Sequence, residues 1–594
     1  MSLNPRLLLW KAFALASCIP LLASCASLRP SVSPLKDFAW ETELGAAEVA
    51  PQTDVGDEKA LAHYVAAQID LNDGDYPEAT REYEEAVKAD PQSSLLRREL
   101  AKLYIRANRL QDAREQLETV VKLRPEGVQA RLLLAGLLTS LEEDDAAIEQ
   151  YQEVIRLDPD NRNAYLFLAA LYGKRQEYDK ATEMMHQLTT VKPNSFMGQY
   201  YLGRMLAASG HPEEAEKAYA RALEIRPNAV AVLFDNAILY ESRSRFDEAI
   251  DLYEEILRQE PQNTKARERL GRLYVGQQKL DEALSQFQEL EKVESDPTDT
   301  RVKLGLIHLE KGDYDKAITE FTLVLAADPE RAPVRYYLAS VYAKIGDDER
   351  AVEEFGKVPV DSELYSDAVA NIGYIRQKQG NINAAVEAIE KGLEAKPGDP
   401  DLIGLLAALY REQKDVPRAI ELTKQLTEAE PDNDQYQFTL GALYDEAGDR
   451  DACIELMQKA IELNPHNAAA LNYLGYTYAE MSIRLEEAEN LVRRALELAP
   501  NDGFYVDSLG WVYYQRGDYQ KAVEQLERAM ELAGDDPTIT EHLGDAYRQT
   551  SQRQKALGLY EQALQRAEGK EQEERIRRKI EAMRGGDPEA GRDS

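Results

Sequence analysis

Residues 147–181 read AIEQYQEVIRLDPDNRNAYLFLAALYGKRQEYDKA, and this stretch decides the fold. It begins and ends on an alanine, and Ala147 and Ala181 are 34 residues apart. Pro159 lies inside it, and a proline cannot continue a helix, so one helix ends there. Asn161 follows closely and is a residue type that caps the start of the next helix. The stretch therefore predicts two helices joined at a proline.

The same 34-residue spacing runs through most of the chain. Prolines recur at one gap, or at twice that gap where one repeat lacks the proline: Pro91, Pro125, Pro159, Pro193, Pro227, Pro261, Pro329, Pro397, Pro431 and Pro465. A small residue follows the same spacing, with one inserted residue late in the chain: Ala79, Ala113, Ala147, Ala181, Ala215, Ala249, Ala283, Ala317, Ala351, Ala385, Ala419, Cys453, Ala488, Ala522 and Ala556. Internal repetition at this period is typical of helical-repeat arrays.

A second position holds only alanine or glycine in all fifteen repeats. It comprises Ala67, Ala101, Ala135, Ala169, Gly203, Ala237, Gly271, Gly305, Ala339, Gly373, Ala407, Gly441, Gly475, Gly510 and Gly544. We expect the first small series to let the two helices of a repeat approach closely, and the second series to do the same on helix B. Glycines at the turn are expected to end helix A in the left-handed conformation; they are Gly74, Gly210, Gly312, Gly346, Gly380, Gly448 and Gly517.

This pattern resembles the tetratricopeptide repeat, a unit of 34 residues. The resemblance covers about residues 60–568. It implies an all-α fold, a right-handed superhelical solenoid of about fifteen helix pairs. Residues 291–299 and 356–365 lack the proline in phase, so we expect longer or bent connections there.

The rest of the chain falls into short segments around the array. Residues 58–568 are the predicted repeat array, residues 569–584 a helix that caps its open end, and residues 585–594 a disordered tail. The cap is expected because a solenoid needs a closed terminal face, and because Ile576, Ile580 and Met583 form one apolar stripe. Residues 25–57 contain three prolines and little periodicity and are interpreted as a flexible tether, with an r.m.s. reach of roughly 30 Å.

The N-terminal segment carries the features of an export signal. Arg6 and Lys11 precede a short apolar run that ends in Leu22-Ala23-Ser24-Cys25. This ending resembles the lipobox of bacterial lipoproteins, which implies a signal peptide over residues 1–24, cleavage before Cys25 and acylation of its thiol by fatty acids such as palmitate. In that family an acidic residue after the cysteine marks inner-membrane retention. Ala26 and Ser27 follow here, so the outer membrane is favoured. The alternative is an ordinary signal peptide cut after Ala26.

Composition narrows the possible functions. The formal net charge is −36, and an acidic surface of this strength repels phosphate backbones, so we expect no nucleic-acid partner. Of the three cysteines, only Cys453 lies outside the N-terminal segment. One cysteine cannot form a disulfide framework. We interpret Cys453 as a small buried residue.

No pattern of catalytic residues stands out. The six histidines are scattered and have no nearby cysteine, so a metal site is not expected, and there is no glycine-rich phosphate loop or nucleophile elbow. The repeats use nearly the whole chain, and no segment of catalytic-domain size remains. We therefore expect no enzyme and no cofactor.

In the tetratricopeptide family, helices A line an extended concave face that binds protein. On the C-terminal helices A the expected inward positions are aromatic and polar. The candidate protein-binding residues are Asn472, Tyr476, Asp507, Trp511 and Tyr514. Aromatic side chains beside polar ones suit recognition of a peptide or helix. The alternative, weighed equally, is that Trp511 and its neighbours pack between repeats as core.

The C-terminal repeats have a second, narrower resemblance. The segments 471–476 and 507–513, LNYLGY and DSLGWVY, resemble the C-terminal region of large repeat lipoproteins of proteobacterial outer membranes. This implies a lipid-anchored scaffold with its body in the periplasm, binding proteins. Some relatives are adaptors that bring cell-wall hydrolases to a carboxyl-terminal processing protease. The alternative is a structural subunit of a polysaccharide or protein export machine.

The lipobox gives the first testable prediction. Cys25→Ala removes the acylated thiol, so the body is expected to fold normally but to leave the membrane fraction. Cell fractionation and labelling with radioactive palmitate measure both effects. Persistent labelling and membrane retention of the variant would contradict the prediction.

Overall fold

The structure is a computed structural model that describes residues 56–534, 536–567 and 569–584. All regular elements in these ranges are α-helices, 31 in number. The chain divides into two compact units, residues 1–320 and 321–594, and the boundary falls within helix α17 (Tyr314–Ala327). The predicted signal peptide, most of the predicted tether and the predicted C-terminal tail lie outside the described residues.

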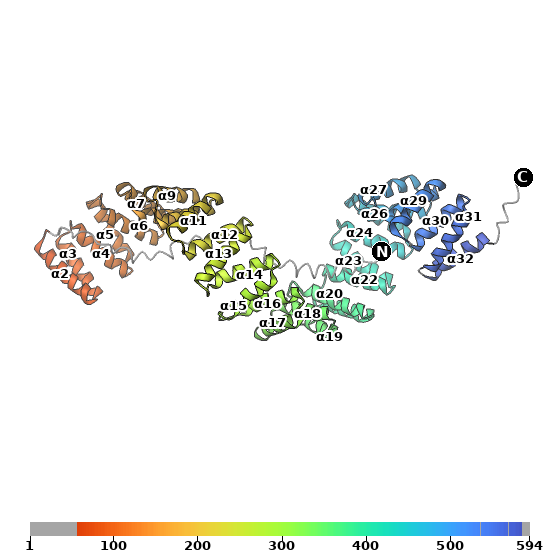
Figure 1. Cartoon of the computed structure of the whole chain (residues 1–594), viewed down its shortest axis with the longest axis horizontal. Helices are drawn as coiled ribbons and strands as arrows, with labels where there is room; N and C mark the ends of the chain where they lie inside the picture. The colour runs from red at the N-terminus through yellow and green to blue at the C-terminus, as the bar shows by residue number, and fades with distance from the viewer. Residues whose placement is uncertain (1–55, 535, 568, 585–594) are drawn as a thin grey trace. The chain divides into compact units, whose positions relative to one another are not determined.

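Unit 1 consists of helix pairs that follow one another along the chain (Figure 1). Its helices are α2 (Glu58–Asp73), α3 (Tyr76–Ala89), α4 (Ser94–Arg106), α5 (Leu110–Leu123), α6 (Val128–Ser140), α7 (Asp144–Leu157), α8 (Arg162–Lys174), α9 (Tyr178–Val191), α10 (Phe196–Ala208), α11 (Pro212–Ile225), α12 (Val230–Ser242), α13 (Phe246–Gln259), α14 (Thr264–Gly276), α15 (Leu280–Glu291) and α16 (Thr298–Lys311).

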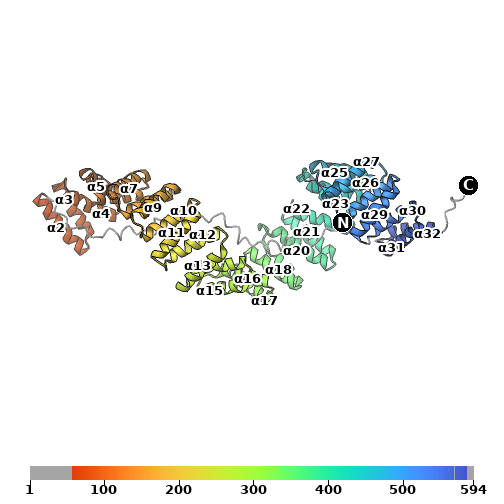
Figure 2. The same cartoon turned by 45° about the horizontal axis from the view of Figure 1, so that its top comes forward.

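Unit 2 continues the same pattern, as the turned view also shows (Figure 2). Its helices are α18 (Ala332–Ile345), α19 (Asp348–Phe355), α20 (Tyr365–Lys378), α21 (Ile382–Ala395), α22 (Pro400–Glu412), α23 (Val416–Ala429), α24 (Asp434–Glu446), α25 (Arg450–Leu463), α26 (Ala468–Glu480), α27 (Leu485–Leu498), α28 (Gly503–Gln515), α29 (Tyr519–Ala533), α30 (Pro537–Gln549), α31 (Arg553–Gln565) and α32 (Lys570–Arg584).

Each even-numbered helix from α2 to α30 is a helix A, and the next helix is its helix B. Within each unit, a helix A contacts its own helix B most extensively, and a helix B also contacts the following helix A, as α3 contacts α4. Neighbouring repeats therefore share their cores. The fold is the all-α helical-repeat solenoid predicted from the sequence.

The two small series mark the points of closest approach within a repeat. Ala79 and its equivalents lie on helix B and are fully buried, Ala283 among them. The second series, expected on helix B, lies instead on helix A. At Gly203 of α10, an added Cβ would stand 2.6 Å from the ring of Tyr219 on α11. At this crossing even the methyl group of an alanine would force Tyr219 or the helices to move.

The turns follow the prediction made from their glycines. All seven adopt positive φ angles between 76° and 85°, where a residue without Cβ carries no steric penalty. At Gly74, for example, the backbone N–H caps helix α2 by bonding the carbonyls of Asp70 and Leu71. The glycine thereby satisfies carbonyls that the end of the helix leaves open.

The two irregular junctions are longer, as predicted. Residues 292–297 separate α15 from α16, and residues 356–364 separate the short helix α19 from α20, whereas four residues, 90–93, join α3 to α4. Before and after each junction the helices still alternate between helix A and helix B.

Cys453 occupies the small position of helix α25 and is fully buried. Burial, followed by the charge of Asp445, raises the pKa of its thiol to about 12. Within the part of the chain that the structure describes, no helix has the length and apolar character needed to cross a bilayer.

The helix crossing gives the second prediction. Ala283→Leu places a large side chain at a fully buried crossing, and overpacking of this kind costs about 1–3 kcal/mol. In a solenoid, local damage of this size can split thermal unfolding into two transitions. Ser285→Leu, at an exposed position of the same helix α15, is the matched control. A single, unshifted melting transition for Ala283→Leu would contradict the assigned register.

Candidate functional site

The predicted lipidation residue, Cys25, lies outside the described residues. The five predicted protein-binding residues lie on two helices A of unit 2: Asn472 and Tyr476 on α26, and Asp507, Trp511 and Tyr514 on α28. The structure joins four of them with Glu480 and His542 in one network. We call Tyr476, Glu480, Asp507, Trp511, Tyr514 and His542 the C-terminal cluster.

Asn472 stands apart from this network. It lies one helical turn before Tyr476, and its side-chain Oδ1 is buried without a hydrogen-bond partner among the described residues. The structure therefore places Asn472 on the same helix as the cluster but gives it no bond to the cluster.

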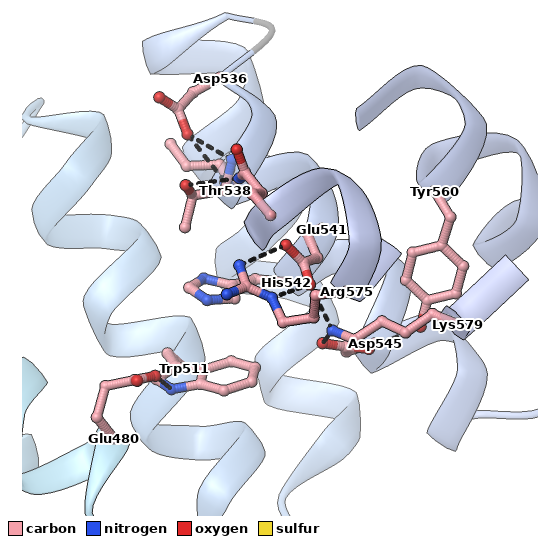
Figure 3. Close-up of polar contacts among 12 residues, drawn as sticks. Glu480, Trp511, Asp536, Thr538, Glu541, His542, Asp545, Tyr560, Arg575 and Lys579 are labelled. Atoms are coloured by element: carbon pink, nitrogen blue, oxygen red, sulfur yellow. Dashed lines mark hydrogen bonds and ion pairs between the residues drawn. The ribbon is translucent and has the colours of Figure 1, made fainter. Parts of the chain in front are cut away.

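Trp511 is the centre of the C-terminal cluster. Its ring is stacked on that of His542 from α30, with centroids 4.1 Å apart, and on that of Tyr514, with centroids 4.7 Å apart. The indole N–H donates a hydrogen bond of 2.8 Å to Glu480 Oε1 on α26 (Figure 3). Only 9% of Trp511 is exposed. Its side chain therefore ties three successive helices A together and presents little surface.

A buried charge pair holds the other side of the cluster. His542 Nδ1 lies 3.0 Å from Asp507 Oδ1, and both residues are buried. Burial lowers the pKa of the His542 imidazole, but the Asp507 carboxylate, with Asp545 and Glu480, outweighs burial and leaves the pKa above its usual value. The charged pair is favoured because each partner offsets the other's loss of hydration.

Helix α32 covers two further carboxylates next to the cluster. Glu541 and Asp545 on α30 are 2% and 3% exposed. Arg575 donates two hydrogen bonds of 2.9 Å to Glu541, one to each oxygen, and Lys579 reaches both Glu541 at 2.7 Å and Asp545 at 2.5 Å (Figure 3). Asp545 also accepts a 2.7 Å bond from Tyr560.

These cations keep Glu541 ionised. Burial raises the pKa of Glu541, but the bonds from Arg575 and Lys579 outweigh burial and leave the pKa below its usual value. Glu541 is therefore held as a carboxylate, paired by charge-assisted bonds that are stronger than neutral ones.

Sequence reasoning did not include Glu480, His542, Arg575 and Lys579 among the candidate residues. A signal was present for the last two, because Arg575 and Lys579 stand 34 residues after Glu541 and Asp545. Helix α32 thus occupies the position of the next helix A. His542 follows Asp507 by 35 residues, one repeat later, so these two residues also lie on successive helices A.

Exposed side chains surround this buried network. Phe504 is 51% exposed. It lies on α28 about one helical turn before Asp507 and two turns before Trp511. The Arg575 side chain is 50% exposed even while it bonds Glu541. An apolar ring and a guanidinium at the edge of a rigid cluster are side chains that protein partners commonly contact.

Among the described residues, no group of three or more histidine, cysteine, aspartate or glutamate side chains could hold a metal ion. The Asp507–His542 pair has the composition of an acid/base dyad, but the imidazole is enclosed by Trp511, Tyr476 and Asp507. The arrangement favours a structural role for this pair.

Family models for the tetratricopeptide repeat match most of the chain. The matched segments are residues 64–116, 98–162, 196–229, 242–307, 308–370, 377–443, 434–467, 456–490, 510–551 and 538–574. They include α26, the part of α28 from residue 510, α30 and the start of α32.

One known protein of similar sequence is also a repeat protein. A TPR repeat-containing protein of Pseudomonas aeruginosa is 42% identical over 57 residues, which is 10% of each chain, so the match spans about a tenth of that relative.

Solved structures match at low TM-scores. MamA matches 29% of this chain and 95% of its own, at 27% identity and a TM-score of 0.28. A tetratricopeptide repeat protein from Parabacteroides merdae matches 48% of this chain and 98% of its own, at 18% identity and a TM-score of 0.27. The structure of Naa15/Naa10 bound to HypK-THB matches 89% of this chain and 98% of its own, at 13% identity and a TM-score of 0.32.

The repeat pattern, the stacked helix pairs and the family models agree. Tetratricopeptide repeats are typical of scaffolds that bind proteins and not of catalysts. This chain belongs to the tetratricopeptide repeat proteins.

Proposed function

We propose that the protein is a lipid-anchored adaptor of the bacterial outer membrane that binds protein partners in the periplasm. In this proposal Cys25 carries the lipid, and the array brings a carboxyl-terminal processing protease together with cell-wall hydrolases. The observation that carries the scaffold role is that helix pairs account for nearly all of residues 58–565. The anchor is supported by the Leu22-Ala23-Ser24-Cys25 sequence.

The C-terminal cluster is the proposed organiser of one partner-binding surface. Trp511 and the Asp507–His542 pair are buried, so they fix the relative positions of α26, α28 and α30. Phe504 and Tyr514 share a face of α28 and are the more accessible aromatic residues there. A rigid base beneath the exposed Phe504 ring and the partly exposed Tyr514 ring reduces the entropy that a partner must overcome on binding.

In vivo crosslinking followed by mass spectrometry of the captured partners tests the adaptor role. We expect a processing protease and cell-wall hydrolases, captured by the intact chain and lost when the array is deleted. Recovery of polysaccharide- or protein-export subunits instead would favour the alternative role as a subunit of an export machine. Capture of neither class would contradict both roles.

Trp511→Ala separates packing from binding. Removing a buried, doubly stacked indole is expected to cost about 3–5 kcal/mol, because truncation leaves a cavity. A thermal melt measures this loss, and capture of the identified protease or hydrolase by the remaining folded protein measures binding. A lowered melt with normal capture assigns Trp511 to the core; an unchanged melt with reduced capture would contradict its role in packing.

Phe504→Ala is the complementary variant, since the ring is exposed. The melt is expected to stay unchanged while affinity for the partner falls by about tenfold or more, as at an aromatic hot spot. Val360→Ala, another exposed apolar residue of unit 2 at 45%, serves as control. Unchanged affinity for Phe504→Ala would remove this surface from the proposal.

The Asp507–His542 pair makes the cluster sensitive to pH. Because the folded pKa of His542 is raised, its contribution to stability is complete below the unfolded value of about 6.5 and is lost as pH rises through the folded pKa. His542→Gln is therefore expected to lower the melting temperature more at about pH 6 than at about pH 9. His186→Gln, at an exposed histidine, controls for the substitution. An equal effect at both pH values would show that His542 is not charged in the fold.

A further inference from the structure

Helix α4 carries a row of cations in a strongly acidic chain. Arg98, Lys102 and Arg106 are spaced four residues apart, so they lie along one side of the helix. We call these three residues the α4 basic face. Residues 94–127, the repeat that contains α4, have eight lysines and arginines against five aspartates and glutamates, whereas the whole chain has a net charge of −36. A local positive surface on an acidic chain attracts acidic partners that the rest of the surface repels.

The contacts of the α4 basic face leave it with an excess of positive charge. Glu99 on the same helix lies 3.2 Å from Arg98 and 2.9 Å from Lys102, so one carboxylate serves two cations. The Lys102 side chain is 42% exposed. The guanidinium of the exposed Arg106 lies 3.5 Å from the centre of the Tyr76 ring, which positions the charge without neutralising it. Like charges four residues apart destabilise a helix, so folding alone does not account for this row.

Neither neighbouring helix A has a carboxylate at the equivalent positions. These positions lie three residues before, one after and five after the small residue of each helix A. They are Tyr64, Gln68 and Asn72 on α2 and Leu132, Gly136 and Ser140 on α6. Helix α6 contains no aspartate or glutamate. At Gly136 an added Cβ would meet only Tyr151 Oη, at 3.9 Å, so a partner can approach the backbone of α6 closely there.

The first two cations of the α4 basic face have one counterpart in the chain, on α32. Arg575 and Lys579 occupy the equivalent positions, and none of the other helices A has a lysine or arginine at both. Arg575 bonds Glu541 of α30 (Figure 3). Lys579 bonds both Glu541 and Asp545. This cation pair therefore binds two carboxylates that lie four residues apart on one helix.

We propose that the α4 basic face binds an acidic helical segment of a partner protein, in which two carboxylates four residues apart bond Arg98 and Lys102. The inference rests on the scaffold role proposed above and specifies the chemistry of one partner. Arg106, one turn further along α4, favours a third acidic residue on the same segment. Leu132 and Gly136 offer an uncharged surface beside the cations for apolar residues of the partner. Charge complementarity of this kind speeds encounter and disfavours basic partners.

Fluorescence anisotropy with a labelled, stapled helical peptide tests the proposal on the full chain in detergent. The peptide has the sequence of residues 537–549, PTITEHLGDAYRQ, and so contains the carboxylate pair that α32 binds. We expect this peptide to bind the full chain. The same peptide with Glu541→Gln and Asp545→Asn should bind about tenfold more weakly, because it lacks both charges. Binding of the acidic peptide should weaken as salt is raised.

Variants of the full chain locate the binding surface. Lys102→Glu should lower the affinity for the acidic peptide by about tenfold or more, because it replaces an attraction by a repulsion. Lys122→Glu makes the same charge change at an exposed lysine on α5 of the same repeat and should leave the affinity unchanged. A peptide with Glu541→Lys and Asp545→Lys should bind the Lys102→Glu chain more tightly than the unmodified chain. This reversal separates an effect of charge from a folding defect.

Equal binding of the acidic and neutral peptides, or binding of neither, would overturn the proposal, as would full affinity of the Lys102→Glu chain for the acidic peptide. Phosphatidylglycerol vesicles present an alternative acidic surface. Binding of these vesicles that depends on Lys102, without binding of the peptide, would assign the face to lipid headgroups and would also overturn the proposal. A crosslinking experiment that recovers neither a protease nor a hydrolase would leave the peptide result unaffected, so the failures of the two proposals are distinguishable.

Discussion

The array depends on one contact, the packing of a helix-B side chain onto a helix-A position that has no room for a larger residue. An added Cβ at Gly203 would meet Tyr219 at 2.6 Å, and one at Gly544 would meet Tyr560 at 2.7 Å. This contact sets the distance between the helices of a repeat. Since a helix pair cannot bury its apolar face alone, the shared cores between repeats supply the remaining stability.

Sequence periodicity predicts most of this architecture because each repeat solves the same local packing problem. The 34-residue period identifies the recurring proline, the turn glycines and both small positions. The assignment of the second small series to helix B was wrong, because both helices need a small residue where they cross. Only the location of the turn, marked by Gly74 after Ala67, distinguishes the two helices.

The candidate site was less predictable, because its geometry depends on residues from successive repeats. Spacing placed Asp507, Trp511 and Tyr514 on one face of a helix, but burial of Trp511 depends on His542 and Glu480 from two other helices. The same neighbour relation brings Arg575 onto Glu541. Buried charges are tolerated only when paired in this way, so a substitution in one repeat also affects the repeat beside it.

Cys453 has a consequence for redox chemistry. Its thiol fills a helix crossing and its pKa is raised to about 12, so the nucleophilic thiolate is scarce and an oxidant has no access to the sulfur. Thiol–disulfide exchange requires attack by a thiolate on a reachable partner. The folded array is therefore inert to exchange in oxidising and reducing surroundings alike, and its stability does not depend on disulfide formation at this residue.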